Sequence, residues 1–177
     1  TIHLDHAGAA GTLMAKLPNA TLVVHPRGAR HMADPSRLIA GSRAVYGDAE
    51  YDALYGEILP VPADRIQSTE DSSTLTLGGR TLTFLHTPGH AKHHHCIVDK
   101  TADGVFTGDT FGLSYRELDV AGRPFIFPTT TPVHFDPDAA HASIERIRGC
   151  GTGAVFLTHY SRVAVSYTHL TLPTSTH

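Results

Sequence analysis

The chain has 177 residues, of which 41% are hydrophobic and 18% charged, and its net charge is −3 when histidine is neutral. This length allows one domain with a sizeable core. The small net charge, without basic or aromatic clusters, argues against a nucleic-acid partner. No apolar run approaches the ~20 residues of a membrane helix. We therefore expect a cytoplasmic protein that contacts neither nucleic acid nor membrane, although any signal peptide would lie upstream of Thr1.

Histidine is the unusual residue in this composition, with 14 copies. Imidazole is the commonest metal ligand among side chains, so the excess favours metal chemistry without locating a site. The two cysteines, Cys96 and Cys150, are too few for a disulfide framework and are interpreted as small buried hydrophobes.

Both ends of the chain carry unusual sequence. The chain opens without a methionine on Thr1-Ile2-His3-Leu4-Asp5-His6, inside a run of ligand-type residues, which indicates an N-terminally truncated fragment. Residues 165–174 resemble the translation of a transposase-derived sequencing adapter, so we expect native sequence over 1–164 and a non-native tail over 165–177. The alternative is an ordinary threonine-rich tail. His169 and His177 are therefore poor ligand candidates.

The first half of the chain predicts mostly helix. Leu13, Met14 and Leu17 fall at helical spacing, and a short β-branched strand follows over 20–25. Residues 27–57 are expected to form helical pieces. The predicted breaks between these pieces lie at Asp34-Pro35, Gly41 and Gly47-Asp48. The aromatic stripe there, which we expect in the core, consists of Tyr46, Tyr51, Leu54 and Tyr55.

The second half predicts short strands. Residues 74–77 and 81–85 form a hairpin pattern around two glycines, and further strands are expected over 93–99, 105–107 and 154–157. Residues 111–136 read as a long irregular stretch, a kind of loop that is often functional. Asp136-Pro137 begins a helix that runs through Arg148. The pattern predicts one mixed α/β domain with helices outside and chemistry at strand ends.

Four motifs hold residues that bind metals. His3-Leu4-Asp5-His6 places three ligand types in four residues, and a tight loop can splay them toward two cations. A polar loop with a helix N-cap at Asp5 is the alternative. His90, Asp109 and His159 each follow a predicted strand. Taken singly, His90 is interpreted as a turn residue, Asp109 as a solvated carboxylate and His159 as a core histidine. Together the three side chains can converge on one pocket.

These motifs resemble the metallo-β-lactamase-fold superfamily over residues 1 to about 160. The pattern of that family is His-x-His-x-Asp-His, then a later His, an Asp and a final His. The matching pieces are Asp5-His6-Ala7-Gly8, Thr87-Pro88-Gly89-His90, Thr107-Gly108-Asp109 and Thr158-His159-Tyr160. The glyoxalase-II-like and uncharacterised hydrolase branches look nearest. The resemblance implies an α/β fold, the αβ/βα sandwich, with its N-terminal strands missing from this chain.

The resemblance also implies a dinuclear centre for two divalent ions, with zinc first and iron or manganese as alternatives. His3 and His90 would bind the first metal and Asp109 would bridge the pair. Asp5, His6 and His159 would bind the second metal. The first histidine of the pattern falls on Thr1, so the first metal is one ligand short and this chain is expected to be impaired. Whether Thr1 replaces a native histidine stays open.

The implied activity is that of a metal-dependent hydrolase, in which a metal-bridging hydroxide attacks the carbonyl of an ester, thioester or lactone. Asp109 and Asp5 would be the catalytic carboxylates, with Asp5 steering the nucleophile or the leaving-group proton. One alternative is a mononuclear iron dioxygenase of the persulfide-dioxygenase type. Another is a metal-binding protein without turnover.

Weaker predictions concern the surroundings of these ligands. Tyr115, Arg116 and Tyr160 are candidates for binding a small-molecule substrate, with a plain loop salt bridge as the alternative. His94 lies in His93-His94-His95 on a predicted strand, where it would face away from its two neighbours and could hydrogen-bond a metal ligand. The sequence names neither the substrate nor the oligomeric state.

Overall fold

The computed structural model describes residues 1–130, 134–160 and 162–165. It divides into two compact units, Thr1–Glu70 and Asp71–His177. The predicted non-native tail lies outside the described residues apart from Val165, and the domain limits of 1–164 stay a prediction. Within the described part of the chain, no helix combines the length and the apolar character needed to cross a membrane.

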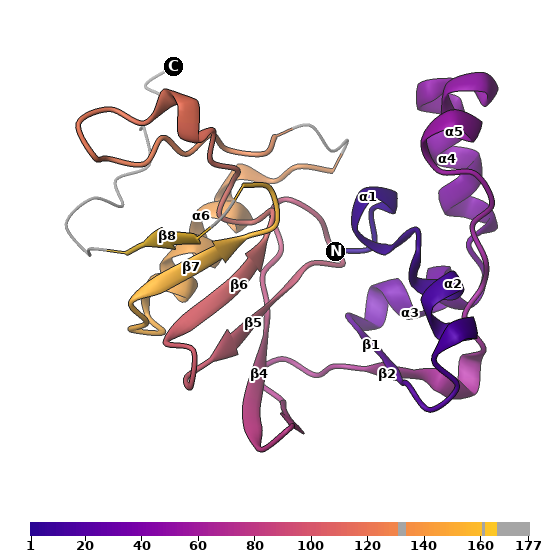
Figure 1. The fold of residues 1–177 in the computed structure, drawn as a ribbon, viewed down its shortest axis with the longest axis horizontal. Coiled ribbons are helices and arrows are strands. Elements are labelled where there is room, and N and C mark those ends of the chain that lie inside the picture. Colours follow the sequence, from indigo (N-terminus) through magenta and orange to yellow (C-terminus); the bar gives the residue numbers. More distant parts are fainter. Residues whose placement is uncertain (131–133, 161, 166–177) are drawn as a thin grey trace. The chain divides into compact units, whose positions relative to one another are not determined.

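The first unit combines short helices with a small parallel sheet (Figure 1). Its elements are α1 (Leu4–Ala7), α2 (Ala10–Lys16), β1 (Leu22–Val24), α3 (Pro26–Ala33), α4 (Ser36–Tyr46), α5 (Asp48–Leu54), the 3-10 turn Ala63–Arg65 and β2 (Ile66–Ser68). Proline at the first position of α3 has no amide that needs a partner, and the ring of His25 accepts the amide of Arg27 to cap that helix.

The structure confirms most of the predicted helices of this unit and corrects two details. Gly41 does not break a helix, because it lies inside α4. Of the aromatic stripe only Tyr51 is buried, whereas Tyr46 is 48% exposed. The Arg43 guanidinium lies 4.2 Å from the centroid of the Tyr51 ring. The core of the unit is made by Ile2, Met14, Val24, Met32 and Val61.

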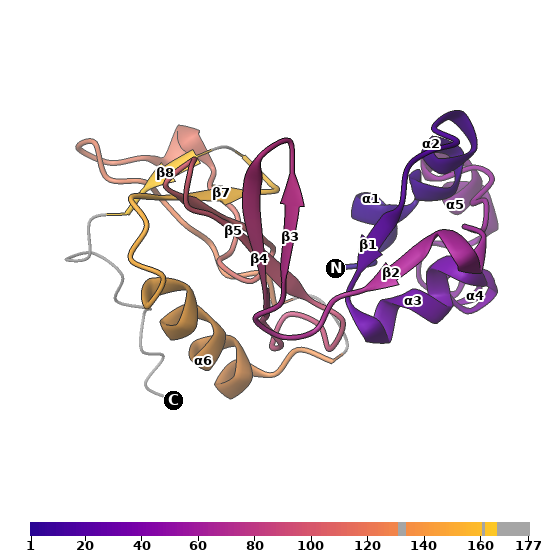
Figure 2. The same ribbon diagram turned by 90° about the horizontal axis from the view of Figure 1, so that it is seen from below.

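The second unit is a six-stranded mixed sheet with one helix against it (Figures 1 and 2). In sheet order the strands are β3 (Thr74–Leu77), β4 (Arg80–His86), β5 (His95–Asp99), β6 (Gly104–Gly108), β7 (Ala154–Leu157) and β8 (Arg162–Ala164). The helix α6 (Pro137–Arg148) begins where predicted, because Asp136 caps it by accepting the amide of Ala139. Ile144 and Ile147 of α6 pack into a core with residues of β4 to β8.

Strand direction brings three loops to one end of this sheet. β4 runs antiparallel to β5, and β5 runs antiparallel to β6, so β4 and β6 point the same way. β6 and β7 are parallel, joined through α6. The carboxyl ends of β4, β6 and β7 therefore open at the same end of the sheet, where β5 begins. The candidate ligands His90, Asp109 and His159 follow β4, β6 and β7, as predicted, and chemistry at these strand ends stays a prediction.

The packing of α6 on the sheet gives a first test. Ile147 is 3% exposed, so Ile147→Ala should lower the free energy of unfolding by about 2–5 kcal/mol through lost burial and the cavity left behind. The measurement is urea unfolding followed by circular dichroism. Val120→Ala, at a side chain that is 72% exposed, is the control and should change stability by less than about 0.5 kcal/mol. Equal effects of the two changes would contradict this assignment of the core.

Candidate metal centre

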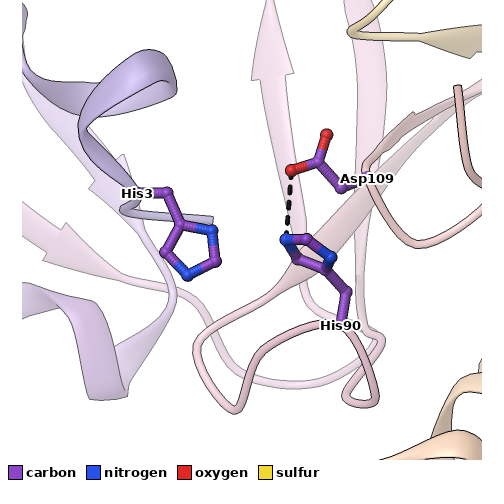
Figure 3. A group of neighbouring side chains, drawn as sticks. All are labelled: His3, His90 and Asp109. Carbon is purple, nitrogen blue, oxygen red and sulfur yellow. Dashed lines mark ion pairs between the residues drawn. The ribbon is translucent and has the colours of Figure 1, made fainter. Parts of the chain in front are cut away.

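Three predicted ligands of the second unit meet at that end of the sheet. His90 follows β4, Asp109 follows β6 and His159 follows β7. The Nε2 atom of His90 lies 3.1 Å from Oδ2 of Asp109 (Figure 3), and Nε2 of His159 lies 3.4 Å from Oδ1 of the same carboxylate. His90 and Asp109 are buried, and His159 is half-buried. One carboxylate thus presents each of its oxygens to an imidazole nitrogen.

The turn that carries His90 is held against α6. Gly89 has a φ of +127°, and a Cβ there would lie 2.3 Å from the backbone of Ala140, so only glycine fits. The carbonyl of Gly89 accepts the amide of Asp136 at 2.8 Å. The hydroxyl of Ser143 donates to the carbonyl of Pro88 at 2.6 Å. The first half of α6 therefore fixes the turn on which His90 stands.

Thr129 links His90 to Asp109, although it belongs to none of the predicted ligand motifs. Nδ1 of His90 lies 3.2 Å from the carbonyl oxygen of Thr129, which can only accept, so Nδ1 carries the proton. The Thr129 hydroxyl lies 3.0 Å from the same Nδ1 and donates to the carbonyl of Asp109 at 2.7 Å. With one proton on Nδ1, the Nε2 lone pair of His90 faces the carboxylate, and a cation between the two groups fits this arrangement.

His94 lies behind the same carboxylate and is fully buried. It precedes β5, so the expected alternation along a strand does not apply to it. Its Nε2 accepts the backbone amide of Asp109 at 3.2 Å, and its Nδ1 lies 2.8 Å from the hydroxyl of Thr87 and 2.9 Å from that of Thr110. Burial lowers the pKa of His94 well below its ordinary value. His94 therefore bonds a predicted metal ligand, through the main chain.

The end of β7 is pinned to the end of β6 and to the loop beyond it. The amide of Thr158 donates to the carbonyl of Gly108 at 3.4 Å, and the amide of Ser114 donates to the carbonyl of His159 at 3.3 Å. These two bonds place His159 beside Asp109. Tyr160, the next residue, has a φ of +73°, a strained conformation for a side chain of this size.

Two of the three predicted substrate-binding residues lie next to each other, and the third forms an ion pair elsewhere. The rings of Tyr115 and Tyr160 lie 5.5 Å apart, between centroids, and both side chains are exposed. Arg116 instead forms an ion pair with Asp119 at 3.4 Å. The plain salt bridge, the alternative for this residue, is therefore what the structure contains.

The other three predicted ligands lie in the first unit. His3 is the N-cap of α1, and its carbonyl accepts the amides of His6 and Ala7 at 3.0 and 2.9 Å. Oδ2 of Asp5 lies 3.3 Å from Nε2 of His6. The expected tight loop is thus a single helical turn, capped by His3 and not by Asp5. The hydroxyl of Thr1 accepts the amide of His3 at 3.4 Å, a structural role for the residue at the first position of the pattern.

The structure therefore places the predicted ligands in two sets. The set of the second unit is His90, Asp109 and His159, which meet around one carboxylate. The set of the first unit is His3, Asp5 and His6, on one turn. That all six form a single dinuclear centre stays a prediction from the sequence pattern.

Comparison with known proteins identifies the family. Residues 2–159 match the metallo-beta-lactamase superfamily. The chain belongs to this superfamily. Its members are mostly metal-dependent hydrolases, and its fold is a dinuclear metal-binding one. Membership supports the ligand chemistry described above, and it confirms the expected α/β fold.

Similar members of the superfamily include the metallo-beta-lactamase fold-containing protein ST1585 of Sulfurisphaera tokodaii. It is 27% identical over 136 residues, which are 75% of this chain and 48% of that protein. The crystal structure of ST1585 from Sulfolobus tokodaii has a TM-score of 0.75 at 25% identity, over 92% of this chain and 60% of that chain. This chain thus spans about half the length of its curated relative.

Two more distant structures share the fold. TTHA1623, solved in a di-iron-bound form, gives a TM-score of 0.64 at 23% identity. BLEG-1, a B3 metallo-beta-lactamase, gives 0.62 at 21% identity. Each match covers 92% of this chain and 68% of the other.

The hydroxyl of Thr129 can be tested alone. Thr129→Val should lower the free energy of unfolding by about 0.5–1.5 kcal/mol, because the Asp109 carbonyl loses one of its two donors and keeps only the amide of Gly112. It should also weaken zinc binding about 10-fold, because His90 loses a partner that orients its ring. Urea unfolding and competition with a zinc-binding dye measure the two effects. Thr76→Val, at an exposed position of β3, is the matched control, and zinc affinity equal in both variants would contradict this role.

Proposed function

We propose that this protein is a metal-dependent hydrolase that cleaves an ester, thioester or lactone. The observation that carries the proposal is the Asp109 carboxylate, whose two oxygens face His90 at 3.1 Å and His159 at 3.4 Å. Divalent cations bound there would supply Lewis acidity and an activated water near neutral pH. We also propose that the protein belongs to the glyoxalase-II-like branch, which acts on thioesters, and that it is cytoplasmic.

The proposed ligand set is the one that the sequence pattern implies. His3 and His90 would hold the first cation, and Asp109 would stand between the two. Asp5, His6 and His159 would hold the second. The sequence pattern supports the ligands of the first unit, and the geometry of the structure also supports those of the second unit. We propose zinc as the metal, with iron or manganese as alternatives, since histidine and carboxylate ligands suit all three.

The residues of this chain have distinct tasks in such a reaction. Asp109, as a buried carboxylate, would offset the positive charge of two neighbouring cations. His90 presents its Nε2 because Nδ1 is tied to Thr129. Asp5 is exposed and paired with His6, so we assign it the role of steering the water or the proton of the leaving group.

The substrate proposal rests on the aromatic pair beside His159. The exposed rings of Tyr115 and Tyr160 have centroids 5.5 Å apart. Tyr160 directly follows His159, a proposed metal ligand, in the chain. Tyr160 has a strained backbone with a φ of +73°, and such strain persists only where the surrounding structure holds the residue in place. We propose that the pair contacts an apolar acyl or aryl group of a small-molecule substrate, with no nucleic-acid or membrane partner.

The hydrolase proposal predicts metal-dependent turnover. The protein, freed of metal by chelation, should regain hydrolysis of an aryl ester, a thioester or a lactone when zinc, manganese or iron is added, at a rate reduced by the ligand missing at Thr1. Asp109→Asn should lower metal affinity on the order of 100-fold or more and abolish turnover, because the shared carboxylate is lost. Asp138→Asn, at an exposed position of α6, is the matched control.

Three results would overturn this proposal. The first is turnover that survives chelation. The second is a single bound iron with oxygen consumption, the signature of the dioxygenase alternative. The third is metal binding without turnover of any ester, thioester, lactone or phosphodiester, which would indicate a binding protein.

Removing the Tyr160 side chain should make the protein more stable and its binding of aryl substrates weaker. Tyr160→Gly should raise the free energy of unfolding by about 1 kcal/mol, because glycine adopts a φ of +73° without strain. The same change should raise KM for aryl or long-chain acyl substrates and leave KM for acetyl substrates unchanged. Tyr160→Phe keeps the ring and should retain the KM of the parent. An unchanged KM for aryl substrates in Tyr160→Gly would remove the pair from the substrate site.

A further inference from the structure

His94 makes an unusual set of hydrogen bonds for a buried histidine. Its Nε2 accepts from the backbone amide of Asp109 at 3.2 Å, and an amide can only donate. Nε2 therefore carries no proton, so the ring proton lies on Nδ1. Nδ1 is shared between the hydroxyls of Thr87, at 2.8 Å, and Thr110, at 2.9 Å. The ring thus has one fixed tautomer and contacts a main-chain group of a proposed metal ligand.

The hydroxyls around His94 fix the orientation of the ring in turn. Thr110 donates its hydroxyl proton to the carbonyl of Thr87 at 3.3 Å, which leaves its lone pairs to accept from Nδ1. The Thr87 hydroxyl lies 3.2 Å from the sulfur of Cys96. Thr87, His94 and Cys96 are fully shielded from solvent. A ring held this way cannot rotate without leaving buried polar groups unpaired, which is costly.

The main chain is shaped to receive this ring. Gly108, which precedes Asp109, has a φ of +52°, and a Cβ there would lie 2.5 Å from Nε2 of His94. A side chain at this position would displace the imidazole from the amide of Asp109. The left-handed glycine also turns the chain at the end of β6, so that the Asp109 amide points to His94.

We propose that His94 is a positioning residue that sets the Asp109 carboxylate by holding its backbone amide. This inference rests on the proposed function, in which Asp109 stands between two cations. The amide bond to His94 and the bond from Thr129 to the carbonyl of Asp109 together fix both polar groups of that residue's main chain. The side chain then leaves the backbone in one direction, toward His90 and His159. Metal affinity and metal geometry depend on this direction.

A purely structural role makes a different prediction. A core histidine that only fills space and satisfies polar groups would affect stability, and any loss of metal binding would follow the loss of stability. A positioning residue acts through one atom, Nε2. Two substitutions test the two ring nitrogens separately. The carbonyl of glutamine reaches the place of Nε2, whereas the amide of asparagine reaches only that of Nδ1.

The decisive experiment compares His94→Gln with His94→Asn in the full 177-residue chain loaded with cobalt(II). His94→Gln keeps an acceptor for the Asp109 amide, so we expect cobalt affinity within about 3-fold of the parent and an unchanged visible absorption spectrum. His94→Asn leaves that amide without an acceptor, so we expect affinity to fall about 10- to 100-fold and the spectrum to change. His141→Gln, at an exposed position of α6, is the control.

Thermal unfolding of the metal-free variants separates positioning from folding. The inference is overturned if the two His94 variants lose cobalt affinity equally, or if the loss follows the change in Tm across them. It is supported if His94→Asn loses more cobalt affinity than its fall in Tm accounts for, and if its spectrum changes while that of His94→Gln does not.

A second measurement does not depend on metal. In uniformly ¹⁵N-labelled, metal-free protein, the N–H to N bond predicts a scalar coupling between the amide nitrogen of Asp109 and Nε2 of His94. An absent coupling overturns the inference. If the parent chain binds no cobalt while this coupling is present, then the proposed function fails and the contact between His94 and Asp109 stands.

Discussion

The shared direction of β4, β6 and β7 is the constraint on which the centre depends. Because the three strands point the same way, their carboxyl ends deliver His90, Asp109 and His159 to one place. The same geometry puts the start of β5, and with it His94, beside them. α6 contributes twice, since it joins two of the strands in parallel and also holds the turn of His90 through Asp136 and Ser143. A sheet with another strand order would scatter the same residues.

Around this centre several buried polar groups hydrogen-bond to one another. The Thr129 hydroxyl joins the ring of His90 to the main chain of Asp109, and His94 joins that main chain to two further hydroxyls. Buried polar groups with partners hold a single arrangement, because each alternative leaves a donor or an acceptor unpaired. Such rigidity suits metal ligands, whose distances must match the cation closely.

The comparisons fit this picture at the level of the fold. The superfamily match runs over residues 2–159 and thus includes the ligand motifs of both units. The chain spans 48% of the curated relative ST1585, so its activity and substrate stay proposals. The exposed pair Tyr115 and Tyr160, whose second member follows His159 in the chain, is the part of the site that we propose contacts the substrate.

The sequence by itself determined the ligand types, the α6 cap at Asp136 and the β3–β4 hairpin, because each depends on neighbours within a few residues. It missed β2 and β8, which have three residues each and too little pattern. It also placed His94 on a strand that begins one residue later. Only the tertiary structure brought Thr129 to His90, 39 positions away in a span that includes β5 and β6, and the Asp109 amide to His94. Those contacts depend on strand pairing and loop return, which carry no local signal in the sequence.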